Sequence, residues 1–161
     1  MITEQKSKLT PAKGILIRYK GDFDLDDLYK KCKDWFGSKK YIFTEKEHTH
    51  KDRSEGHELN VRFSAEREID DYIRFDIETY FFVLYANKKG KFTNANVKIN
   101  IQAWVILDYK NNWQKTAFHK FLFYIYNNYI IKKKIQGVYE EKLFLEMVNY
   151  SKMIKSHLNL N

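Results

Sequence analysis

Polar and apolar residues alternate along much of the first two thirds of the chain, a pattern typical of β-strands with one buried face. Strands are predicted over residues 15–20, 41–50, 59–66, 73–81 and 97–107, and residues 87–96 are predicted to form a turn and loop. The alternation favours an antiparallel sheet, because the strands of a parallel sheet are covered on both faces and are apolar throughout. Strands of this length twist strongly, so the sheet is expected to be curved.

A helical spacing of apolar residues follows the first predicted strand. Asp24 is placed to cap this helix and Gly37 is placed to end it. The apolar stripe of the helix consists of Leu25, Leu28, Cys32, Trp35 and Phe36. Cys32 is therefore predicted to be a buried apolar side chain, because a cysteine nucleophile needs partial exposure and a neighbour that lowers the pKa of its thiol.

The final third of the chain is predicted to form two long helices. Asn111 or Asn112 caps the first, which runs to about Lys134, and a break at Gly137 separates it from a second helix over 138–161. Apolar residues surround the first helix over 121–131, which is typical of a helix buried on two sides. One side is expected to pack on the sheet, and the other on the last helix or on a partner chain. The last helix is expected to lie at the periphery or to contact a partner.

Together these elements predict a single α+β domain over 1–161, with a flexible lead-in at 1–12. The domain is expected to be a curved antiparallel sheet of about five strands, with one helix after the first strand and long C-terminal helices packed on one face.

This order of elements resembles the helix-grip fold of the Bet v 1 and START-like families, in which a curved sheet wraps a long C-terminal helix. The resemblance covers most of the chain. Those families usually have two helices after the first strand and a glycine-rich turn after the second, where this chain has one helix and an isolated Gly56. The resemblance implies an alternative function, the carriage of an apolar small molecule or lipid in a sheet–helix cavity. The residues that would line this cavity are Trp35, Phe63, Phe75, Ile101, Phe118 and Leu122.

The composition narrows the classes of protein that fit this pattern. Hydrophobic residues make up 43% and aromatic residues 17% of the 161 residues, which is too apolar for a disordered chain. Six glycines, one proline and one cysteine exclude a collagen-like chain and a disulfide-stapled mini-protein. No apolar run reaches the ~18–20 residues that a membrane span requires. The polar N-terminus and the lone cysteine favour a cytoplasmic location.

The chain is basic, with 29 Lys and Arg, 21 Asp and Glu, and a net charge of +8. This charge makes nucleic-acid binding through a basic surface a further alternative. The basic residues are interleaved with acidic ones, as in Glu66, Arg67 and Glu68. Because a groove for single-stranded nucleic acid is continuously basic, nucleic-acid binding is not favoured.

The one cluster of metal-ligand residue types is His48, His50 and His57. His48 and His50 project from the same face of a strand, and the turn that follows can bring His57 opposite them. Three imidazoles within reach of one another suit zinc, copper or nickel. A set of solvated histidines at a hairpin end is preferred, because the sequence indicates no further residues that would orient the ligands. No metal or other cofactor is therefore predicted.

The motifs of phosphate-binding loops, zinc proteases, redox cysteines and serine hydrolases are absent from the sequence, so no catalytic residue is assigned. The most unusual segment is the aromatic helix with three lysines after it. Such a segment suits an anionic lipid surface, but aromatic side chains are also the best anchors of protein interfaces. The chain is therefore predicted to be a non-catalytic binding or assembly module for a protein partner or a second copy of itself. The predicted contact residues are Phe121, Tyr124, Tyr126, Tyr129, Ile131, Lys132, Lys133 and Lys134.

Overall fold

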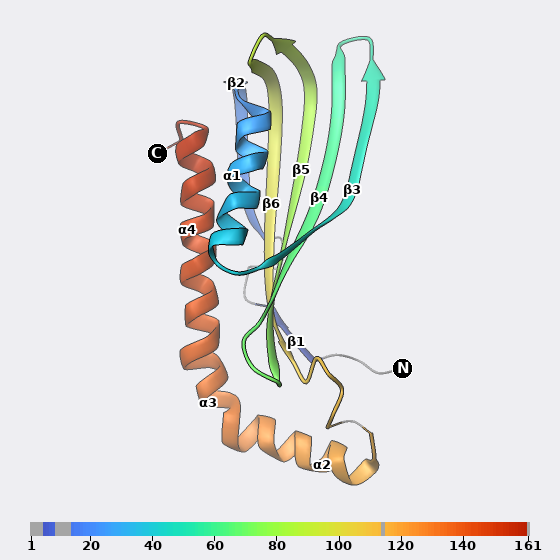
Figure 1. Cartoon of the computed structure of the whole chain (residues 1–161), viewed down its shortest axis with the longest axis vertical. Helices are drawn as coiled ribbons and strands as arrows, with labels where there is room; N and C mark the ends of the chain where they lie inside the picture. The colour runs from blue at the N-terminus through green and yellow to red at the C-terminus, as the bar shows by residue number, and fades with distance from the viewer. Residues whose placement is uncertain (1–4, 9–13, 114, 161) are drawn as a thin grey trace.

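The structure is a computed structural model that describes residues 5–8, 14–113 and 115–160. It confirms the α+β class, with an open antiparallel sheet and C-terminal helices (Figure 1). The strands are β1 (Gln5–Lys8), β2 (Ile15–Phe23), β3 (Ile42–Arg53), β4 (Gly56–Glu68), β5 (Ile73–Lys89) and β6 (Phe92–Leu107). The helical segments are α1 (Leu25–Ser38), α2 (Ala117–Ile125), η1 (Tyr126–Ile131), α3 (Lys132–Lys134), η2 (Ile135–Glu140) and α4 (Glu141–His157).

Strands β3 to β6 form an antiparallel meander in which each strand pairs with the next. The other edge of β6 pairs with β2 over 93–101 and with β1 over 104–107. Because β1 and β2 follow one another along this edge, the sheet is five strands wide. The long strands bend along their length (Figure 1), as the predicted curvature requires.

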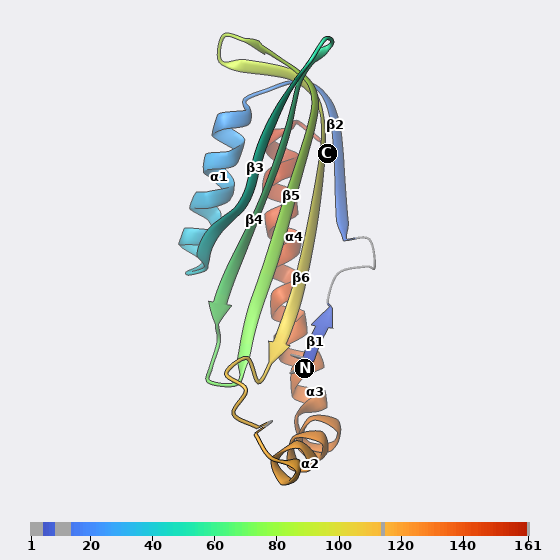
Figure 2. The ribbon, with the colours of Figure 1, turned by 90° about the vertical axis from the view of Figure 1, so that its right-hand side faces the viewer.

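Helices α1 and α4 lie on the same face of the sheet (Figures 1 and 2). The alternation of polar and apolar residues along the strands determines which side chains these two helices cover. Along β5, Phe75 and Ile77 are fully buried, whereas Arg74 and Asp76 project from the opposite face. On α1, Cys32 of the predicted apolar stripe is fully buried, which confirms it as a core residue.

The centre of the core is a cluster of aromatic rings from α1, β4 and α4. The ring centroid of Phe36 lies 4.8 Å from that of Tyr150 and 6.0 Å from that of Phe63. All three side chains are fully buried. The hydroxyl of Tyr150 shares a hydrogen bond of 3.2 Å with Thr79 Oγ1 on β5, so this buried polar group is not left unpaired. One cluster therefore joins both helices to the sheet.

An ionic contact joins α4 to the strands further along the helix. Arg67 on β4 donates to Glu146 on α4 at 2.9 Å, and its guanidinium lies 4.4 Å from the centroid of the Tyr41 ring. The Tyr41 hydroxyl donates to the same carboxylate at 2.7 Å. Arg67 also donates to the carbonyl of Lys39 at 2.8 Å, so it fixes the link between α1 and β3 as well.

Two segments predicted to be irregular contain strands. Gln5–Lys8, inside the predicted flexible lead-in, forms β1 because its backbone pairs with β6; residues 1–4 and 9–12 lie outside the described residues. The predicted loop at 87–96 is a hairpin, in which Gly90 occupies the turn with a φ of 63°. In both segments backbone pairing continues where the apolar alternation is weak, so alternation alone underestimates strand length.

The predicted break at Gly137 is wrong. Helical structure is continuous from Ala117 to His157, and the chain changes direction near α3 (Figure 1). Gly137 lies inside the π-helical segment η2. The cap of the first C-terminal helix is Thr116 rather than Asn111 or Asn112, because the Thr116 side chain accepts a hydrogen bond from a backbone N–H of α2.

Helix α4 is not peripheral, because one side of it lies in the core. Leu143, Met147 and Tyr150 are fully buried against the sheet and α1. At its C-terminal end, His157 contacts the start of α1, where its Nε2 lies 3.0 Å from the carbonyl of Asp24. The side chain of Asp24 caps α1, as predicted, by accepting from the Asp27 N–H at 2.9 Å.

Replacing Phe36 with alanine is expected to lower the free energy of unfolding by about 3–5 kcal/mol, because the substitution opens a cavity at the centre of the core. Urea denaturation measures the change. Ile42→Ala provides the control, since Ile42 is 71% exposed and its loss is expected to change stability by less than about 0.5 kcal/mol. Equal effects of the two substitutions would contradict the assignment of the core.

The stability of the fold is expected to fall as the pH rises above about 10. Burial raises the pKa of four tyrosines well above that of a free tyrosine: Tyr29, Tyr41, Tyr72 and Tyr150. The unfolded chain therefore loses these protons at a lower pH than the folded chain, and the stability present below this pH is lost above it. Circular dichroism and tyrosinate absorbance are expected to change together during an alkaline titration. Full tyrosinate absorbance in a chain that keeps its secondary structure would contradict this expectation.

Candidate functional site

Helix α2 and segment η1 lie beyond the end of the sheet (Figures 1 and 2). The turn that leads there depends on Asp108, whose buried carboxylate accepts hydrogen bonds from the backbone N–H groups of Asn112 and Trp113 at 2.9 and 3.2 Å. This turn directs the chain past the end of β6. The expectation that one side of this aromatic helix packs on the sheet is therefore wrong for α2.

The inner side of α2 and η1 rests on Tyr72, in the turn between β4 and β5. The Tyr72 hydroxyl donates to Asn127 Oδ1, and its ring makes edge contacts with Tyr126 at 5.9 Å and tilted contacts with Phe123 at 6.2 Å. Trp113 stacks on Tyr126 with the ring centroids 5.8 Å apart. Burial raises the pKa of Tyr72, so its hydroxyl remains a protonated donor above the pH at which a free tyrosine ionises.

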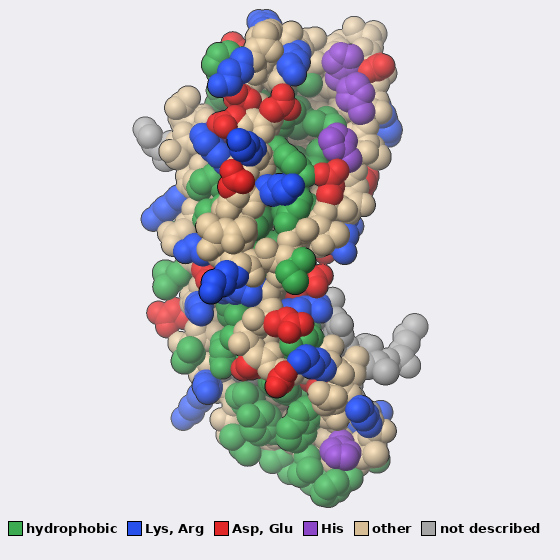
Figure 3. Space-filling model, in the orientation of Figure 1, with side chains coloured by type: hydrophobic (Ala, Val, Ile, Leu, Met, Phe, Trp, Pro, Cys, Tyr) green, Lys and Arg blue, Asp and Glu red, His purple; other side chains and the backbone are tan. Residues whose placement is uncertain are grey.

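The outer side of α2 and η1 exposes five large apolar side chains, each between 59% and 77% exposed: Phe118, Phe121, Tyr124, Tyr129 and Ile130. We call these five residues the tip surface. Figure 3 shows hydrophobic side chains gathered at this end of the molecule. Phe118, Phe121 and Tyr124 are spaced three residues apart, which places them on one side of α2. A gathered group of exposed apolar side chains, unlike a scattered one, marks an interaction site.

The structure divides the predicted contact residues between two sides. Phe121, Tyr124, Tyr129 and the three lysines of α3 are exposed, whereas Tyr126 is half-buried and Ile131 is buried. Ile130 was missing from the predicted set, and Phe118 was assigned to a cavity. The three-residue spacing of Phe118, Phe121 and Tyr124 is the signal that identifies Phe118 as part of the exposed side.

The segment that carries the tip surface contains basic residues but no acidic ones. Between Tyr109 and Tyr139 there is no aspartate or glutamate, and this stretch contains six lysines: Lys110, Lys115, Lys120, Lys132, Lys133 and Lys134. The rest of the chain mixes acidic and basic residues. On the sheet face opposite the helices, for example, Arg62 pairs with Glu78 at 2.9 Å and Arg74 with Asp76 at 2.7 Å.

The six predicted cavity residues do not surround one space. Phe63, Phe75 and Ile101 are fully buried in the core between sheet and helices, and Trp35 packs beside them. Phe118 and Leu122 lie on α2, beyond the end of the sheet. Two pockets of about 300 and 410 Å³ lie on the opposite, polar face, where both are lined by Arg62, Glu78 and Gln102 among others.

The histidines of the predicted metal cluster are brought together only in part. His50 and His57 lie close to each other at the end of the β3–β4 hairpin, with Asp52 between them. His48 has its Nδ1 3.2 Å from Glu45 and is not part of this group. Asp52 was missed, although strand alternation places it on the same face as His48 and His50.

The chain matches no protein-family model, no curated protein and no solved structure. The resemblance to the helix-grip fold therefore stays a prediction. Over residues 5–8, 14–113 and 115–160, no helix has the length and apolar character needed to cross a membrane.

Replacing Tyr72 with alanine is expected to release the tip from the sheet, because Tyr72 contacts α2 and η1 through both its ring and its hydroxyl. Backbone amides of 117–131 are expected to exchange hydrogen for deuterium faster in this variant, while those of β4 to β6 keep their protection. Tyr72→Phe retains the ring contacts and is expected to have a smaller effect. Equal loss of protection across the sheet would show that Tyr72 supports the core rather than the tip.

Proposed function

We propose that this chain is a non-catalytic binding module that docks on a partner protein with an acidic surface, through the tip surface and the lysines around it. The observation that carries the proposal is the group of five exposed apolar side chains on α2 and η1. Aromatic residues anchor protein interfaces because they bury a large area and lose little conformational entropy. Phe121 and Tyr124, at adjoining positions on the exposed side of α2, are expected to be the main anchors.

The charge around the tip surface favours an acidic partner. Lys120 lies on α2 between the exposed aromatic residues, and the three lysines of α3 follow η1; all four are exposed. Carboxylates of a partner would gain from this charge, whereas two copies meeting through the same surface would bring their lysines together. Docking on a different protein is therefore favoured over self-association.

The shape of the exposed apolar region suits a protein better than a bilayer. Large apolar side chains are also exposed on η2 and α4, namely Val138, Phe144 and Leu145. Figure 1 shows that α4 runs at a steep angle to α2. A flat bilayer would contact one of these two arms, while a protein surface can contact both. Nucleic acid fits less well, because the aliphatic members of this region cannot stack on bases as aromatic rings do.

We further propose a cytoplasmic location for the module. Cys32 on α1 is a free thiol that is fully buried in the hydrophobic core of the protein. Burial raises its pKa to about 12, so the thiol stays protonated and unreactive at neutral pH. A lone free cysteine is typical of proteins in a reducing compartment, where disulfides are rare.

The proposal is tested by site-specific crosslinking in the cells that make the protein. A photoreactive benzoylphenylalanine replaces Phe121 in one variant and Ile42, a still more exposed residue on β3, in the control. The Phe121 variant is expected to capture one protein that the Ile42 variant does not capture. Capture of lipid or of a second copy of the chain, or no difference between the two positions, would refute the proposal.

Reconstitution from purified proteins tests the role of the charge. With the captured partner, Phe121→Ala is expected to weaken binding by about tenfold or more, as the loss of an interface anchor does. Lys133→Glu is expected to weaken binding at low salt and to matter less as the salt concentration rises, because salt screens exposed charges. Ile42→Ala is expected to leave the affinity unchanged. An affinity that is insensitive to salt would contradict the acidic character of the partner.

A further inference from the structure

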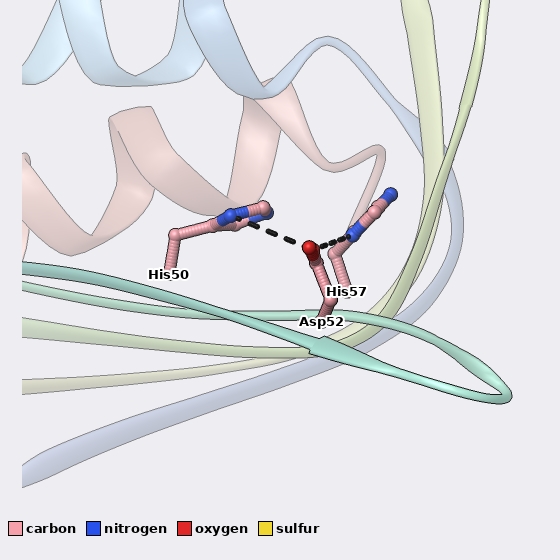
Figure 4. A group of neighbouring side chains, drawn as sticks. All are labelled: His50, Asp52 and His57. Atoms are coloured by element: carbon pink, nitrogen blue, oxygen red, sulfur yellow. Dashed lines mark hydrogen bonds and ion pairs between the residues drawn. The ribbon is translucent and has the colours of Figure 1, made fainter.

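Three side chains at the end of the β3–β4 hairpin present metal-ligand atoms to a common space (Figure 4). Nδ1 of His57 lies 2.7 Å from Oδ1 of Asp52, and Nδ1 of His50 lies 3.7 Å from the same oxygen. One ligand atom from each of the three residues lies within 4.8 Å of the other two. Figure 4 shows both imidazole rings turned toward the carboxylate.

The pairing of the two strands produces this arrangement. Asp52 is directly opposite His57, and His50 is opposite Leu59, the next residue on the same face of β4. His50 and Asp52 share a face because they are two residues apart on one strand. Gly56 fixes the tight turn: its φ is +132°, and a Cβ at this position would lie 2.9 Å from the backbone of Tyr85. The ligand set therefore depends on backbone register rather than on flexible loops.

We propose that His50, Asp52 and His57 form a site for a divalent ion of the zinc type. Imidazole nitrogens and a carboxylate oxygen suit Zn²⁺, and also the neighbouring ions Cu²⁺, Ni²⁺ and Co²⁺. Three ligands around a tetrahedral zinc ion lie about 3.4 Å apart, so shifts of about 1 Å in the side chains complete the geometry. The fourth position is open to water, because the group is exposed at the surface.

The neighbouring cations do not occupy this space. Lys51 and Arg53 alternate with the ligand residues and so project from the opposite face of β3. Arg53 is also held there by Glu58, whose carboxylate lies 2.5 Å from the guanidinium. The positive charges nearest in sequence are thus turned away from the incoming ion.

The position of the site gives the ion a structural role. Every residue of β3 from Thr44 to Arg53 is exposed, so this end of the hairpin has no core of its own. It is held by the strand ladder and by surface contacts. An ion bound by His50 and Asp52 on β3 and by His57 on β4 would tie the two strands together and resist their separation.

Titration calorimetry with Zn²⁺, on protein prepared without a polyhistidine tag, tests the proposal. The wild-type chain is expected to bind one ion, and His50→Ala, Asp52→Asn and His57→Ala are each expected to weaken binding by at least about tenfold. His48→Ala is the matched control, because His48 is an exposed histidine on the same face of the same strand. The affinity of the His48→Ala variant for Zn²⁺ is expected to equal that of the wild type.

Two further measurements separate a built site from scattered surface binding. Co²⁺ is expected to give the visible absorption of a four-coordinate ion with the wild-type chain and with His48→Ala, but not with His57→Ala. Zn²⁺ is expected to slow the amide exchange of residues 48–60 in the wild type and in His48→Ala, but not in His57→Ala. No bound ion, several weakly bound ions, or an equal loss of binding in the His48→Ala variant would overturn the proposal. These outcomes do not depend on the tip surface.

Discussion

The burial of one face of the sheet beneath α1 and α4 is the interaction on which the rest of the molecule depends. Phe36, Phe63 and Tyr150 meet where the two helices and the sheet come together, and removing their surfaces from water is the main favourable contribution to this packing. The hydrogen bond between Tyr150 and Thr79 offsets the cost of burying a phenol. The contact between Arg67 and Glu146 then restricts how α4 can lie on the sheet, because each group has its partners in only one arrangement.

This core does not cover the whole length of the sheet: Ile73 and Leu107 are buried at one end, whereas the hairpin residues 87–92 at the other end are exposed. Strands β5 and β6 contain 17 and 16 residues, which corresponds to more than 50 Å at ~3.3 Å per residue. Helix α1 contains 14 residues and α4 contains 17, or roughly 21 and 26 Å at ~1.5 Å per residue. The sheet therefore extends past α1 and α4 at its hairpin end (Figure 1). The hairpin of β3 and β4 projects at one end and α2 lies beyond the other, and side chains at both ends are free to serve binding rather than packing.

The sequence predicted the parts of this arrangement that follow from burial. The alternation along β5 identified its buried face, and the stripe on α1 identified Cys32 and Phe36 as core residues. The sequence-based prediction failed where backbone pairing determines the length of a strand, or where the tertiary fold determines the path of a helix. Gly90 occupies a tight turn, and the two strands that it joins continue beyond the residues whose polar and apolar positions alternate. Gly137 lies within a continuous helix, because glycine permits a break in a helix without requiring one. The position of α2 was not predictable, because a helix that is apolar on all sides does not indicate which surface covers it.

The two candidate sites differ in how much of each could be identified from the sequence. His50 and His57 were identified from residue type, but only the register of the hairpin shows that Asp52, rather than His48, completes the group. For the tip, the aromatic residues were identified as a set, and only the contacts of Tyr72 and Trp113 show which side of that set faces inward. In each case the missing information was the orientation of side chains, which depends on residues distant in sequence.

Charge and exposure at the tip are best understood together. Exposed aromatic side chains on their own promote association of a protein with its own copies. In this chain the lysines beside them oppose such association by repulsion, and the same charge would attract carboxylates of a different protein. A surface that combines apolar anchors with a single sign of charge therefore selects its partner by what it repels as well as by what it binds. Under the proposed function, this combination would account for a segment without any acidic residue in a chain whose opposite sheet face pairs Arg62 with Glu78 and Arg74 with Asp76.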